Sequence, residues 1–301
     1  MSLLHILAGI RTPVLDYIAL FFSSLGGEII FLCAISVIFW CFSKTAAYKL
    51  MFSYVIFAPV TCIINLILRV PYPWAQDSSL TPLGLFSTRL TGYSMPSLGL
   101  FTIILLCIGI LVNNSNVIVK ISCIAVSVIS TFSYLYLGLC NALSALISIA
   151  IAVAAAILFT VFVNSMQFDI SRYHVYLMIS SIPMLVMVCM AVSLYLNGVI
   201  TLNALSVNIS LAGMLVGLLF SWYFESNFIN FNIRCTRAYK QFLKALIGTG
   251  STVITYAALS IAFSFIPGFW ASAFICNLIT SVGSFGAYPL FIQSIFASNY
   301  N

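Results

Sequence analysis

Three short stretches of this sequence place polar and aromatic side chains at the ends of strongly apolar segments. They are Arg69–Trp74, Gly92–Leu100 and Ser133–Asn141. A guanidinium such as that of Arg69 is suited to an anionic group, and a thiol such as that of Cys140 is a candidate nucleophile once it is deprotonated. If the apolar segments cross a bilayer in alternating directions, all three stretches lie on one face. The chemistry to consider is therefore anion binding or nucleophilic attack at a membrane surface.

The composition of the chain indicates its class. Of the 301 residues, 63% are hydrophobic and 5% are charged, and the mean hydropathy is +1.18. A soluble domain carries roughly a quarter charged residues, so we expect a polytopic integral membrane protein. Membrane topology accounts for the formal charge of +6, and no nucleic-acid partner is predicted. The nine cysteines are scattered without a CxxC pair, which predicts packed thiols and no disulfide framework, metal site or other cofactor.

The apolar segments predict an all-α bundle of about nine transmembrane helices. Their expected ranges are 28–42, 46–68, 95–112, 117–136, 141–163, 175–196, 205–224, 245–266 and 270–296. The N-terminal residues 1–24 are expected to form helices that either lie in the membrane interface or make a hairpin. Four glycines in the last two spans would allow close helix approach: Gly248, Gly250, Gly283 and Gly286.

The basic residues divide unequally between the two sides of these spans. Eight of the 11 basic residues fall on one side, and three, Arg11, Arg69 and Arg89, fall on the other. The positive-inside rule places the larger set in the cytoplasm. The loop 69–93 and the turn 134–141 then face outward. The polar connector 225–244 lies inside, and its basic end is suited to the lipid headgroup layer.

In order and spacing, the three stretches resemble the signatures of the type-2 phosphatidic-acid phosphatase (lipid phosphate phosphatase) superfamily. Those signatures are K-x6-R-P, P-S-G-H and S-R-x5-H-x3-D. Arg69-Val-Pro-Tyr-Pro-Trp74 is similar to an R-x-P-R-P-W form of the first signature. Gly92-Tyr-Ser-Met-Pro-Ser97 resembles the approach to the second, and Ser133-Tyr-Leu-Tyr-Leu-Gly-Leu139 resembles the third as far as its histidine.

The later segments look like a bacterial branch of this superfamily with extra C-terminal helices, so the resemblance covers nearly the whole chain. It implies a phosphatase-like transmembrane core over residues 25–200, preceded by residues 1–24. Residues 201–301 would be the additional helices, with the basic connector at 225–244. The resemblance further implies a bacterial cytoplasmic membrane with the three stretches on the extracytoplasmic side.

When the family's signatures are matched to this sequence, all six functional side chains are replaced. In the family, two histidines and an aspartate perform attack, orientation and leaving-group protonation, while a lysine and two arginines hold the phosphate. The matching positions are Asn65 (lysine), Tyr72 and Tyr134 (arginines), Gly99 (general acid), Cys140 (nucleophile) and Ser144 (aspartate). The positions that shape turns and helix starts are kept: Pro73, Pro96, Ser97, Ser133 and Gly138. The pattern implies a protein that keeps the fold of the family but has lost its catalytic side chains.

Three functions follow as alternatives. The first is an inactive relative that binds a phospholipid or polyprenyl-phosphate headgroup or regulates lipid metabolism, with binding residues Arg69, Tyr72, Arg89, Ser97 and Tyr134. The second is a diverged lipid phosphatase acting through Cys140 or relocated cations, although no basic residue lies within ten positions to lower the pKa of that thiol. The third is a lipid transporter or flippase. Membrane lipids are the expected partners, with a second copy or another membrane protein left open.

Overall fold

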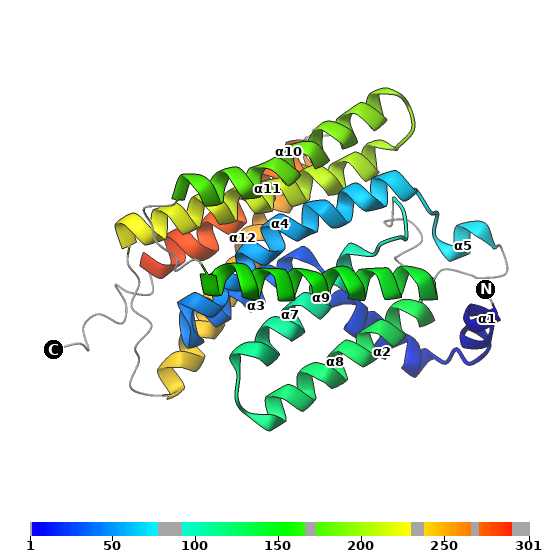
Figure 1. The fold of residues 1–301 in the computed structure, drawn as a ribbon, viewed down its shortest axis with the longest axis horizontal. Coiled ribbons are helices and arrows are strands. Elements are labelled where there is room, and N and C mark those ends of the chain that lie inside the picture. Colours follow the sequence, from blue (N-terminus) through cyan, green and yellow to red (C-terminus); the bar gives the residue numbers. More distant parts are fainter. Residues whose placement is uncertain (1, 78–91, 166–172, 230–237, 266–270, 291–301) are drawn as a thin grey trace.

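The computed structural model describes residues 2–77, 92–165, 173–229, 238–265 and 271–290, and these fold into helices with no strand among them (Figure 1). The helices are α1 Ser2–Gly9, α2 Pro13–Ser24, α3 Glu28–Val37, α4 Lys44–Leu68, α5 Pro73–Gln76, α7 Leu98–Asn113, α8 Val117–Tyr136, α9 Ala142–Ser165, α10 Tyr173–Leu196, α11 Leu202–Phe224, α12 Ala238–Ser264 and α13 Ala271–Val282. Three π-helical turns extend helices: η1 Ile38–Phe42, η3 Glu225–Ile229 and η4 Gly283–Ala287. The prediction of an all-α fold is confirmed.

Several of the long helices begin at a side chain that caps the first free backbone N–H groups. Ser43, Ser97 and Thr201 each accept a hydrogen bond from the backbone N–H three residues later. Asn116 does the same for the N–H two residues later. Such caps satisfy donors that have no partner inside the helix. They explain why these helices start close to where the apolar segments begin in the sequence.

Six of the described helices are long and apolar enough to cross a membrane, and α2 with α3–η1 adds a seventh if this pair, bent by 63°, is one broken span. The chain is therefore an integral membrane protein by the length and composition of its helices. The expected nine spans are not reached by this measure. Helix α7 has 16 residues, about 24 Å at 1.5 Å per residue, which is shorter than the roughly 30 Å hydrocarbon layer.

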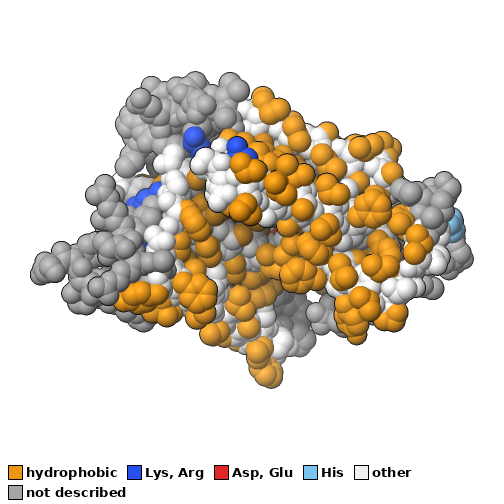
Figure 2. Space-filling model, turned by 90° about the horizontal axis from the view of Figure 1, so that it is seen from below, with side chains coloured by type: hydrophobic (Ala, Val, Ile, Leu, Met, Phe, Trp, Pro, Cys, Tyr) orange, Lys and Arg blue, Asp and Glu red, His pale blue; other side chains and the backbone are white. Residues whose placement is uncertain are grey.

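The long helices α4, α9, α10 and α11 run side by side in the bundle (Figure 1). Helix α4 contacts α7, α9 and α10, while α11 packs against α10 and most extensively against α13. Hydrophobic side chains cover much of the described surface (Figure 2). On α8, for example, Ile121, Ile124 and Phe132 are exposed. Because lipid tails are as apolar as these side chains, such a surface is stable within a bilayer and would not be in water.

The basic connector 225–244 is helical in both of its described parts. Residues 225–229 form η3 at the end of α11, and residues 238–244 belong to α12. Lys244 is buried, with 2% of its surface exposed, in a helix that packs against α3 and η1. The remaining residues of the connector, 230–237, lie outside the described part of the chain.

Glycine permits close packing at several positions where a side chain would collide with a neighbouring helix, among them Gly213, Gly217 and Gly248. A Cβ atom on Gly213 would lie 2.2 Å from the Phe274 carbonyl oxygen, and one on Gly217 would lie 2.0 Å from Ser281 Oγ. A Cβ on Gly248 would lie 2.0 Å from Trp40. Of the four glycines predicted to allow close approach, Gly248 alone has a neighbour within 3.4 Å of such an atom. The crossing of α11 with α13 was not predicted.

We expect Gly248→Ala to lower the free energy of unfolding by about 1–3 kcal/mol, because the new methyl group would enter the buried Trp40 ring. Gly250→Ala is the matched control on the same helix, since nothing lies within 4 Å of its new methyl group. That control should be neutral or stabilising by up to about 1 kcal/mol. Thermal unfolding of both variants in one detergent measures the difference, and equal effects would contradict the packing argument.

Candidate functional site

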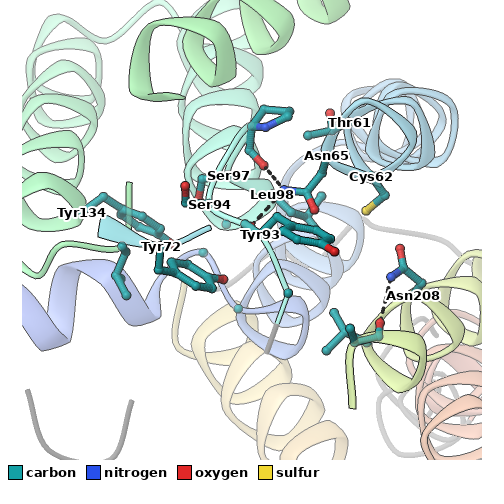
Figure 3. A pocket seen from close by; sticks show the side chains of 18 of the residues that line it. Thr61, Cys62, Asn65, Tyr72, Tyr93, Ser94, Ser97, Leu98, Tyr134 and Asn208 are labelled. Carbon is teal, nitrogen blue, oxygen red and sulfur yellow. Dashed lines mark hydrogen bonds between the residues drawn. The ribbon is translucent and has the colours of Figure 1, made fainter. Parts of the chain in front are cut away.

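A cavity of about 390 Å³ lies where the three motif stretches meet the break between α2 and α3 (Figure 3). Its walls come from that break, the last turns of α4, the loop 92–97, the start of α7, the end of α8 and the start of α11. The lining contains more apolar than polar surface. A cavity of this volume is within the usual range for small-molecule sites.

The structure brings together most of the residues that the sequence singled out. Asn65, Tyr72, Ser97, Gly99 and Tyr134 all line the cavity.

The other sequence-predicted residues lie elsewhere. Cys140 and Ser144 are fully buried and do not line the cavity. Arg69 is exposed at the end of α4, where its backbone is left-handed with φ 48°, and it is not part of the lining either. Arg89 lies outside the described residues.

Tyr134 occupies the space that a side chain at position 99 would need. A Cβ atom on Gly99 would lie 2.1 Å from the Tyr134 hydroxyl, and one on Gly26 would lie 2.5 Å from the same oxygen. The hydroxyl donates a hydrogen bond of 3.1 Å to the Ser23 carbonyl. Two replaced motif positions are thus complementary, since the large residue at 134 fills the volume left by the small one at 99.

Two other replaced positions hold the loops around the cavity in place. The side-chain amide of Asn65 donates to the carbonyls of Tyr93 and Pro96, each at 2.9 Å, and so ties the end of α4 to the loop 92–97. Ser144 Oγ donates to the carbonyl of Ser94 in the same loop. Both side chains use their N–H or O–H donors on the protein backbone. Their role in this structure is to fix the walls of the cavity.

Cys140 is poorly placed to act as a nucleophile. It lies in the turn between α8 and α9, where its side chain has no exposed surface. Burial raises the pKa of the Cys140 thiol to about 12. A raised thiol pKa means that the protonated, unreactive form persists at neutral pH.

We expect Cys140 to resist alkylation by N-ethylmaleimide at pH 7 in the folded protein. Relative to an ordinary thiol of pKa 9.0, the thiolate fraction of a thiol with pKa about 12 is about a thousandfold lower at this pH. Labelling should rise with pH, because thiolate accumulates as pH approaches the raised pKa. Peptide mass spectrometry checks this, with the same chain unfolded in detergent as the fully labelled control. Rapid labelling of the folded chain at pH 7 would contradict it.

The charged residue that lines the cavity was not among the predicted site residues. Glu28 lies at the start of α3, directly after the Gly26-Gly27 break, and its Oε2 accepts hydrogen bonds from Ser210 Oγ (3.1 Å) and Asn277 Nδ2 (3.0 Å). Among the described residues, no lysine or arginine lines the cavity. The signal available in the sequence was an isolated carboxylate at the beginning of an apolar span, which is uncommon and typical of functional groups in membranes.

Two further features bear on chemistry. His5 Nε2 lies 2.9 Å from Asp77 Oδ2, both side chains being partly exposed and neither lining the cavity. Across the described residues, no group of three His, Cys, Asp or Glu side chains is arranged to hold a metal ion.

Comparison with known proteins adds no relative. No family model, curated protein or solved structure matches this chain. The resemblance to the lipid phosphate phosphatase superfamily therefore rests on the residues of the three stretches. The function has to be argued from the cavity itself.

Proposed function

We propose that this chain is an integral membrane protein that holds a lipid in the cavity of Figure 3 without hydrolysing it. The supporting observation is the Tyr134 hydroxyl, which stands where a side chain at Gly99 would have to project. The cavity keeps the room for a headgroup but offers none for a general acid at that position. Together with the buried, protonated thiol of Cys140, this favours binding over phosphate-ester hydrolysis.

The membrane topology in this proposal follows the charge distribution. In the nine-span arrangement predicted from the sequence, eight of the 11 basic residues fall on one side, which would place the cavity and the three stretches on the extracytoplasmic side of a bacterial cytoplasmic membrane. The core that carries the cavity corresponds to residues 25–200 and would be related to lipid phosphate phosphatases. Helix α11, from the C-terminal segment, contributes Asn208 to the same cavity.

The proposal is tested by measuring both binding and turnover on one purified sample. In mixed micelles with phosphatidic acid, phosphatidylglycerol phosphate or undecaprenyl pyrophosphate, we expect no phosphate release above a protein-free control. Native mass spectrometry of the same sample should show a phospholipid retained at about one per chain. Tyr93→Trp places a larger side chain in the wall of the cavity and should reduce this retention. Turnover that disappears in Cys140→Ala would overturn the proposal and establish cysteine chemistry.

A second candidate, lipid translocation, is favoured by one observation. Glu28 is a carboxylate beside the bent junction of α2 and α3, and transporters place charged groups at interrupted helices. Proteoliposomes containing a fluorescent phospholipid test this alternative. Accelerated exchange between leaflets that Glu28→Gln abolishes would support it over static binding.

A further inference from the structure

The charge and hydrogen-bonding character of the cavity indicate which headgroup it takes, provided that the proposed lipid binding holds. A phosphatase pocket surrounds its substrate with cations, but the described lining here carries one charged side chain, the carboxylate of Glu28. Its Oε2 accepts two hydrogen bonds, whereas Oε1 receives none from the described residues. An oxygen of the Glu28 carboxyl group is therefore available to accept from a ligand.

Four of the neighbouring polar side chains have their donors turned toward the protein. Asn65 gives both N–H bonds of its amide to backbone carbonyls, and Thr61 and Tyr134 give their hydroxyl protons to the carbonyls of Phe57 and Ser23. Asn208 also donates to a carbonyl, that of Ala204 (Figure 3). What these side chains retain for a ligand are the lone pairs of their oxygens.

The acceptor oxygens of these four side chains, together with the carboxylate, suit a group that is positively charged and rich in N–H donors. A primary ammonium has three such donors and would pair with Glu28 at short range in a largely apolar cavity, where charge interactions are strong. A quaternary ammonium has the charge but no N–H donors, and a bare phosphate would be repelled. The first backbone N–H groups of α7, at Leu98 and Gly99, have no partner inside the helix and could take the phosphate of a zwitterion.

We propose that the bound lipid carries a primary ammonium in its headgroup and that this ammonium pairs with Glu28 Oε1 in the cavity. The chemical class is an aminophospholipid, of which phosphatidylethanolamine is the simplest probe. Asn65 and Asn208 contribute acceptor oxygens from α4 and α11. The ligand thus bridges the core to the C-terminal helices.

The test compares three lipids of equal chain composition by native mass spectrometry of the detergent-purified protein. We expect phosphatidylethanolamine to bind at least about tenfold more tightly than phosphatidylglycerol, a difference of about 1.4 kcal/mol, with phosphatidylcholine in between. In Glu28→Gln this preference should fall to near unity, because phosphatidylethanolamine loses its charged partner and phosphatidylglycerol is no longer repelled. Ser210→Ala is the matched control, since it removes a hydrogen bond to Glu28 but keeps the charge and should keep the preference.

A gain-of-binding variant keeps the proposal testable if Glu28→Gln folds poorly. Asn208→Asp adds a second carboxylate to the lining and should strengthen phosphatidylethanolamine binding several-fold. A preference for phosphatidylethanolamine that survives Glu28→Gln would overturn the ammonium assignment and leave lipid binding intact. Wild-type protein that binds phosphatidylglycerol more tightly than phosphatidylethanolamine would do the same. If free ethanolamine displaces the lipid at equal concentration, the cavity recognises the free amine, and the proposal that the ammonium belongs to a lipid is wrong. Failure of the wild-type protein to retain any of the three lipids would instead contradict the proposed function itself.

Discussion

The Gly99→His substitution is expected to leave the chain without phosphatase activity and to lower its free energy of unfolding by about 3 kcal/mol. The new side chain would begin 2.1 Å from the Tyr134 hydroxyl, and that residue is buried at 7% exposure with its hydroxyl bonded to Ser23. Overpacking of a buried site costs about 1–3 kcal/mol, and displacement of Tyr134 also removes a buried hydrogen bond. Thermal unfolding in detergent and phosphate release from phosphatidic acid measure the two effects.

A compensating variant separates crowding from other damage at this position. Gly99→His combined with Tyr134→Ala removes the obstructing ring, so the double variant should unfold at a higher temperature than Gly99→His alone. Tyr134→Ala by itself opens a cavity and should cost about 3 kcal/mol. Additive losses in the double variant would show that the two positions do not share space.

The second large effect concerns a buried ion pair at the other end of α4. Lys44 Nζ pairs with Glu225 Oε1, and the Tyr48 hydroxyl donates to Glu225 Oε2. The Glu225 side chain has 2% of its surface exposed, against 24% for Lys44. We expect Lys44→Met to destabilise the protein by about 3 kcal/mol, because it removes a charged partner from a buried carboxylate. Chemical or thermal unfolding in detergent measures the loss.

The difference in burial predicts that the two partners respond unequally. Glu225→Gln keeps a hydrogen-bond acceptor for Tyr48 and leaves a lysine that can reach solvent, so it should cost about half as much as Lys44→Met. In the double variant, Glu225→Gln should recover part of the stability lost in Lys44→Met, which a double-mutant cycle measures. Equal losses in the two single variants would show that the lysine is as firmly buried as the glutamate.

The positions of the helices could be predicted from the sequence, because each long apolar run must satisfy its backbone within itself inside a membrane. The predicted span 117–136 coincides with α8, Val117–Tyr136, and the predicted 46–68 lies within α4. The bend between α2 and α3 could not be predicted, since Gly26-Gly27 permits several geometries and packing against α7 selects one. Similarly, Gly248 and Gly250 are equivalent in sequence but differ in what lies opposite each of them.

The candidate site was predictable in part for the same reason. Asn65, Tyr72, Gly99 and Tyr134 gather at one cavity because they lie at span ends that alternation places on one face. The charge of the cavity was not predictable from those stretches. Glu28 comes from a segment before them, and its direction depends on Ser210 and Asn277, which are more than 180 residues away in the chain.

The shortness of α7 has a consequence for how the cavity meets the lipid. Its 16 residues span about 24 Å, roughly 6 Å less than the hydrocarbon layer; if its C-terminal end lies at one membrane surface, the cavity at its N-terminal end lies several ångströms inside the hydrocarbon at the other. A headgroup that reaches Glu28 must then sink below the level of its neighbours, or the surrounding leaflet must thin. Either adjustment costs less in a membrane of short acyl chains. Occupancy of the cavity should therefore report on membrane thickness as well as on headgroup chemistry.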